Sequence, residues 1–79
     1  MSSREKVLAI LREVKPTKNM EGLEDIIDGG YIDSFELMLL ISLLNDGFGI
    51  EIGVDDITAE NFNSVDSIAA MAERLKNRE

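Results

Sequence analysis

Ser34 is the residue of this chain best placed to do chemistry, because the surrounding sequence predicts an exposed hydroxyl at the start of a helix. Asp33 and Glu36 have the spacing of a capping box, in which two side chains accept hydrogen bonds from each other's backbone amides. Such a hydroxyl can serve as an attachment point. Most serines at helix starts are only capping residues, so the rest of the sequence must decide between these roles.

The chain lacks both cysteine and histidine. This excludes disulfides, thiolate metal sites, serine–histidine catalysis and histidine metal sites or general bases. Only carboxylates and hydroxyls remain, so we expect neither an enzyme nor a metal site. The absence of cysteine also fits a reducing compartment.

A calcium loop is one alternative for the acidic residues before the helix. Asp25 to Glu36 has the required length, with suitable residues at loop positions 1, 6, 9 and 12. Ile27 and Gly29 occupy positions 3 and 5, however, and offer no side-chain oxygen. The pattern therefore argues against calcium.

Asp55 and Asp56 could be considered an acid/base pair. Adjacent carboxylates at a helix start more often complement the helix dipole, and no second catalytic group accompanies them. We therefore do not expect a free-standing catalytic site.

The net charge of −8 is distributed unevenly along the chain. Residues 19–73 contain thirteen acidic residues and no basic one, and all eight lysines and arginines lie outside this segment. Such a field repels nucleic acid and anionic lipid and attracts basic protein surfaces. It indicates a protein partner with basic residues.

Apolar periodicity predicts an all-α fold: a small four-helix bundle with three main helices and one short helix, formed by residues 1–79 as a single domain. A capping box of Ser2 and Glu5 begins the first helix, which should end near Val14 or Lys15, before Pro16. The long connection that follows should form a short helical turn. We expect three apolar anchors there: Leu23, Ile26 and Ile27.

The helix that begins at Ser34 should run to about Asp46 and carries two apolar stripes. One stripe has the spacing of a core face: Leu37, Leu40, Ile41, Leu44 and Phe48. The other lies below Ser34 and is a candidate partner surface: Phe35, Met38, Leu39 and Ser42, with Asn45 at its end. So small a domain hides only about 60% of its unfolded surface, which makes burial of both stripes difficult.

Three further elements are predicted after this helix. Alternating Ile50, Ile52 and Val54 indicate an extended connector with its apolar side against the core. Residues 55–62 should form a one- or two-turn helix anchored by Ile57 and Phe62. Asn63 or Ser64 should cap the last helix, whose buried stripe is Val65, Ile68, Ala69, Ala72 and Leu75.

No apolar run is long enough for a membrane span, and the first residues do not have the pattern of a signal peptide. We expect a soluble, cytoplasmic protein that is a monomer.

An ordered set of short motifs resembles the acyl carrier protein family over nearly the whole chain. The set begins with Gly30-Tyr31-Ile32 and Asp33-Ser34-Phe35, and Phe48-Gly49-Ile50-Glu51-Ile52 starts fourteen residues after the serine. The remaining pieces are Asp56-Ile57, Glu60-Asn61-Phe62, Ser64-Val65 and Ser67-Ile68. Each piece is weak alone, whereas the set with these spacings is specific.

The resemblance implies a four-helix bundle whose serine, here Ser34, receives 4′-phosphopantetheine from coenzyme A. The terminal thiol of this arm would hold an acyl or aminoacyl thioester. Asp33 matches the aspartate that helps present the serine to the phosphopantetheinyl transferase. The other implied partners are a ligase that loads the cargo and downstream synthase or transferase enzymes of fatty-acid, polyketide or related synthesis.

The sequence departs from fatty-acid carriers, in which the helix after the serine usually exposes many acidic residues. Here the partner-binding face is mainly apolar, with Phe35, Met38 and Leu39, and Glu36 is its nearest acid. The next helix would supply further charge from Asp55, Asp56 and Glu60. The serine–phenylalanine pair also occurs in D-alanyl carrier proteins, so a D-alanyl or peptidyl carrier remains an alternative.

A second hypothesis belongs to another class: an unmodified acidic domain that binds a partner helix or groove through Phe35, Met38 and Leu39. Both hypotheses use the same face, so modification of Ser34 is what distinguishes them.

Repulsion among the acidic residues should destabilise the fold at low ionic strength. We expect the melting temperature, measured by circular dichroism, to rise when salt or a divalent cation is added. A melting temperature that does not respond would show that the repulsion is smaller than the charge distribution suggests.

Overall fold

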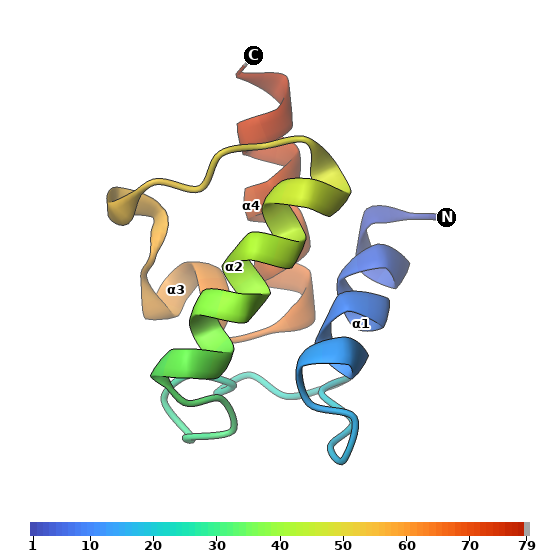
Figure 1. Ribbon diagram of the computed structural model, residues 1–79, viewed down its shortest axis with the longest axis vertical. Helices are drawn as coiled ribbons and strands as arrows, with labels where there is room; N and C mark the ends of the chain where they lie inside the picture. The colour runs from blue at the N-terminus through green and yellow to red at the C-terminus, as the bar shows by residue number, and fades with distance from the viewer. Residues whose placement is uncertain (79) are drawn as a thin grey trace.

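The computed structural model describes residues 1–78, which form an all-α bundle as predicted. Three main helices, α1 (Ser3–Val14), α2 (Ser34–Phe48) and α4 (Val65–Asn77), pack against one another. A short helix, α3 (Ala59–Phe62), packs on α4, and a 3₁₀ turn, η1 (Val54–Asp56), precedes it. The long loop before α2 lies at the same end of the bundle as Ser34, whereas the connector after α2 crosses the opposite end (Figure 1).

The predicted boundaries of α1 are confirmed. The Ser2 amide donates to the Glu5 carboxylate at 3.0 Å, and the Glu5 amide donates to the Ser2 hydroxyl at 3.2 Å. These bonds from the backbone and the hydroxyl of Ser2 hold the pKa of Glu5 below its usual value. The stabilisation is therefore present above the pKa of Glu5 in the unfolded chain and is lost as pH falls through the folded value.

The second helix is longer than predicted: α2 ends at Phe48 rather than near Asp46. Gly47 is accommodated inside the helix at a close approach to α1, since a Cβ atom at this position would lie 3.3 Å from Ile10 Cδ1. Gly49 ends the helix in a left-handed conformation with φ of 64°. The two additional helical residues include Phe48, which lies in the core.

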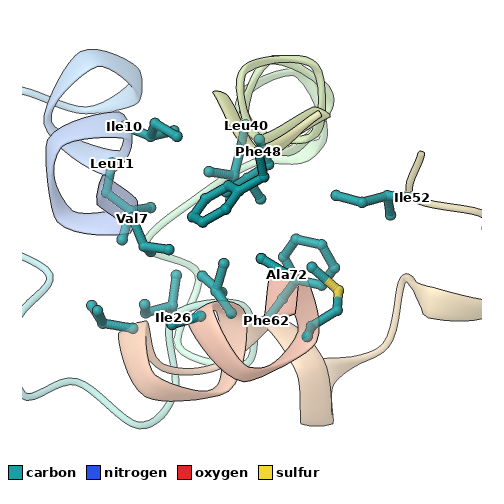
Figure 2. Close-up of a cluster of buried hydrophobic side chains, with 14 of the residues drawn as sticks. Val7, Ile10, Leu11, Ile26, Leu40, Phe48, Ile52, Phe62 and Ala72 are labelled. Atoms are coloured by element: carbon teal, nitrogen blue, oxygen red, sulfur yellow. The ribbon is translucent and has the colours of Figure 1, made fainter. Parts of the chain in front are cut away.

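The core lies between α1, α2 and α4, as Figure 2 shows for a cluster of its side chains. Leu40, Leu44 and Phe48 of the predicted core stripe are buried, and Leu37 and Ile41 are half-buried against them. The stripe predicted for the last helix is also buried, with Met71 in addition. Ser64 is the residue that caps this helix.

The segment between α2 and α4 differs from its prediction in three respects. Ile50 and Ile52 are buried as expected, but Val54 is 85% exposed because the chain turns into η1 at this residue. The predicted helix over 55–62 is two separate pieces, interrupted at Ile57 and Thr58. Phe62 is an anchor, whereas Ile57 is 38% exposed and is not.

The long loop contains hydrogen-bonded turns and no regular helix, and the predicted helical turn corresponds to the bond that the Gly29 amide donates to the Asp25 carbonyl. Its backbone bonds include Gly29 N to Asp25 O and Tyr31 N to Ile26 O, the second at 3.1 Å. Ile26 is buried, and Leu23 and Ile27 are half-buried. The three predicted anchors thus hold the loop on the core without a regular helix.

No helix within residues 1–78 has the length and apolar character needed to cross a membrane.

Asn63 connects the long loop to the junction of α3 and α4. Its Oδ1 atom accepts the amides of Ile27 at 2.9 Å and Asp28 at 3.1 Å, and its Nδ2 atom donates to the Asp28 carboxylate at 3.0 Å. Its own carbonyl accepts the Ile26 amide at 3.0 Å. Asn63 therefore satisfies loop amides that a regular helix or strand would otherwise satisfy.

We expect Asn63→Ala to lower the free energy of unfolding by about 1–3 kcal/mol, because it leaves two loop amides without their acceptor. Urea denaturation would measure the loss. Asn77→Ala, an exposed change in the last turn of α4, is the matched control and should have little effect. Equal losses in the two variants would contradict the role of Asn63.

Candidate functional site: Ser34 and the outer face of α2

Ser34 is the first residue of α2 and is exposed. The predicted capping box is present: the Glu36 amide donates to Asp33 Oδ1 at 2.8 Å, and the Asp33 amide donates to Glu36 Oε1 at 3.0 Å. The helical ladder begins with the Leu37 amide, which donates to the Asp33 carbonyl at 2.9 Å. The amides of Ser34 and Phe35 precede that ladder and point out of the helix start, where they favour an anionic group.

The chain on each side of Ser34 is anchored, so its hydroxyl stands at a defined place. Ile32 is buried two residues before the serine, and Leu37 packs on the core three residues after it. Tyr31 is half-buried, and its amide closes the preceding turn. The site is therefore an exposed side chain on a fixed backbone.

Two lysines of the first part of the chain lie at this end of the bundle, which the sequence alone did not indicate. Lys15, which follows α1, forms an ion pair with Glu36 at 3.4 Å. Lys18 Nζ lies 5.0 Å from the centroid of the Tyr31 ring. They bring positive charge beside an otherwise acidic segment, and Lys15 ties the end of α1 to the start of α2.

The second apolar stripe of α2, the candidate partner surface, is exposed to solvent. Phe35 is 77% exposed, Met38 71% and Leu39 40%, and Ser42 is exposed on the same side of the helix. So large an apolar surface on a small protein is typical of an interaction site.

Two polar residues expected on this face make contacts within the fold. Glu36 is half-buried, and its carboxylate accepts the Asp33 amide and pairs with Lys15. These contacts stabilise the start of α2. Asn45 is also half-buried: its Oδ1 atom accepts the Ile52 amide at 3.0 Å, and its carbonyl accepts the Ile50 amide at 3.1 Å. The Asn45 side chain therefore holds the connector in place, and the connector forms no strand within residues 1–78.

The acidic residues of the next segment fall into two groups. Asp55 and Glu60 are exposed, whereas Asp56 is half-buried and its Oδ2 atom accepts the Gly53 amide at 3.0 Å. The same segment exposes two apolar residues that the sequence predicts to face the core, Val54 and Ile57. This segment therefore presents both apolar and acidic groups.

The part of the chain that the structure describes contains no group of three or more histidine, cysteine or acidic residues that could hold a metal ion. In the segment considered as a calcium loop, Asp33 and Glu36 are engaged in the capping box.

The phosphopantetheine attachment site family matches residues 5–75. The chain belongs to this family. A comparison with curated proteins found no match. The resemblance to acyl carrier proteins is thereby confirmed, and so is the implied bundle.

Membership establishes what kind of domain this is. A phosphopantetheine attachment domain is the place of covalent 4′-phosphopantetheine attachment, and it serves as a carrier domain that interacts with a phosphopantetheinyl transferase and with synthesis enzymes. The residues present fit this group, because an exposed hydroxyl stands beside amides that favour an anion at the start of α2.

The capping role of Asp33 can be separated from its charge. We expect Asp33→Ala to lower the free energy of unfolding by about 1 kcal/mol, and Asp33→Asn to change it little, because asparagine caps a helix as well as aspartate does. Urea denaturation of both variants measures this. If asparagine is as damaging as alanine, the negative charge rather than the hydrogen bond stabilises the helix start.

Proposed function

We propose that Ser34 carries the 4′-phosphopantetheine arm and that the chain delivers an acyl or aminoacyl cargo between enzymes. The observation that supports this most is the position of Ser34, an exposed hydroxyl at the first residue of α2 within the segment that matches the family. Exposure lets the transferase reach the hydroxyl, and the fixed backbone presents it always in the same place.

The arm supplies a thiol, which a protein without cysteine cannot provide from its own side chains. The residues around Ser34 do the positioning. Asp33 and Glu36 hold the first turn of α2, Lys15 holds Glu36, and the first-turn amides favour the negative phosphodiester next to the serine. The chain itself performs no bond-breaking step in this proposal.

The outer face of α2 is the proposed docking surface for the transferase, the loading ligase and the downstream enzymes. Apolar contact comes from Phe35, Met38 and Leu39. Negative charge comes from the following segment, with Asp55, Asp56 and Glu60. The Asp56 carboxylate also accepts a hydrogen bond from the Gly53 amide. Partner surfaces that combine apolar and basic side chains fit this arrangement.

An aminoacyl cargo, including D-alanine, is a second candidate beside fatty-acid or polyketide intermediates. It is favoured by Phe35, which follows the attachment serine as in D-alanyl carriers and is 77% exposed. The scarcity of acid on the outer face of α2 also distinguishes this chain from the usual fatty-acid carriers.

The first experiment is to incubate the purified protein with coenzyme A, magnesium and a broad-specificity phosphopantetheinyl transferase. We expect intact mass to rise by one phosphopantetheinyl group in the wild type and not in Ser34→Ala. Ser42→Ala, which removes another exposed hydroxyl of α2, is the matched control and should still be loaded.

Circular dichroism must show that Ser34→Ala keeps the helical fold. Loading of a folded Ser34→Ala protein would overturn the assignment of Ser34. Absence of loading in the wild type would instead favour an unmodified interaction domain that binds its partner through Phe35, Met38 and Leu39.

A further inference from the structure

A shallow apolar groove lies between α1 and α2, away from Ser34. It has a volume of about 320 Å³, and its apolar lining comes from Ala9 and Ile10 of α1 and Leu43 of α2. It lies where Gly47 lets the two helices approach, next to Ile10 Cδ1. Figure 1 shows the two helices beside each other, with the later turns of α2 next to α1.

The groove continues the exposed apolar face of α2. Phe35, Leu39 and Leu43 follow one another at intervals of four residues, so they form a single row along the helix surface. At 1.5 Å per residue, this row is about 12 Å long, or slightly more than two helical turns. Its first two members are exposed, and its third lines the groove.

The rim of the groove carries more negative than positive charge. Glu13 of α1 and Asp46 of α2 are exposed carboxylates on its lining. The single cation, Lys6, is engaged within the fold: its Nζ atom donates to the Gly47 carbonyl at 2.9 Å and lies 4.9 Å from the centroid of the Phe48 ring. The two carboxylates are therefore the charges of the groove that are available to a binding partner.

We propose that this groove docks an amphipathic helix of a partner protein that is apolar on one side and basic on the other. Its apolar side chains, repeated at helical spacing over two turns, would follow the row from Phe35 to Leu43, and lysine or arginine would reach Glu13 and Asp46. The identification of that partner as a carrier-dependent enzyme rests on the proposed function. The surface would then include α1, and not only α2 and the segment that follows it.

The groove lies at some distance from the attachment residue. Leu43 is nine residues beyond Ser34, about 14 Å along α2. The Leu43 end of the row is therefore separate from the attachment residue, whereas its Phe35 end lies directly after Ser34.

The test uses a synthetic peptide with leucine on one helical face and lysine on the other, and the same peptide with glutamate in place of lysine. Binding to the unmodified, ¹⁵N-labelled protein is followed by NMR. We expect the leucine–lysine peptide to shift the amide signals of Ala9, Ile10 and Leu43, and the leucine–glutamate peptide to bind at least about tenfold more weakly.

Two matched pairs of variants separate the groove from general charge. Glu13→Lys should weaken binding of the leucine–lysine peptide about tenfold, whereas Glu24→Lys, with the same change in net charge but in a separate hollow beside Arg4 and Asp66, should not. Ala9→Trp should also weaken binding by filling the groove, whereas Ala70→Trp on the exposed side of α4 should not.

Equal effects of the two charge reversals, shifts confined to residues outside the groove, or equal binding of the acidic peptide would each overturn the proposal. The peptide experiment needs no arm on the protein, and the loading experiment needs no peptide. Failure of the docking groove is therefore distinguishable from failure of Ser34 as the attachment site.

Discussion

The structure depends on a limit to what α2 can bury. This helix is apolar on nearly all sides, yet α1 and α4 cover only the stripe that contains Leu40, Leu44 and Phe48. Without disulfides to support a small core, that stripe must carry much of the apolar burial. The opposite face is left in water with Phe35 and Met38, where apolar residues gain nothing for folding and are available for a partner.

The position of the attachment site follows from polar side chains that replace regular structure. Asn63 holds the loop before α2, Asn45 holds the connector after it, and the capping box fixes the first turn. Each bond satisfies backbone amides that helices or strands satisfy elsewhere. Ser34 can therefore follow a long loop and be exposed, while its backbone keeps a fixed position.

Much of this arrangement could be predicted from sequence because it depends on local patterns. The capping boxes at Ser2 and Asp33 need residues only three positions apart, and the buried stripe of α4 follows from helical spacing. The alternation of Ile50, Ile52 and Val54 predicts three buried residues, and the first two are buried. It failed at Val54, where the turn of η1 redirects the chain.

The features that sequence did not reveal are those between distant residues. Nothing in the sequence around Asn63 indicates that its side chain accepts the amides of residues 27 and 28. Helical periodicity assigns Asn45 to the outer face, because it contains no information about the hydrogen bond from the Ile52 amide. The predicted length of α2 was wrong for a similar reason. Gly47 disfavours an isolated helix, but here it permits contact with Ile10, and the packing of Phe48 favours two more helical residues.

The folded chain brings charged residues together that are far apart in the sequence. In sequence, basic residues are confined to the ends, which suggests a uniformly acidic middle. In the structure, Lys15 and Lys18 return to the Ser34 end, while Lys6 neutralises the carbonyl end of α2 near Gly47. Because Lys6 and Lys15 are engaged within the fold, the exposed carboxylates of Glu13, Asp46, Asp55 and Glu60 remain available to a partner. A basic partner is thus drawn toward the later turns of α2 beside the groove, whereas the apolar row that it would follow begins at Phe35, directly after the serine.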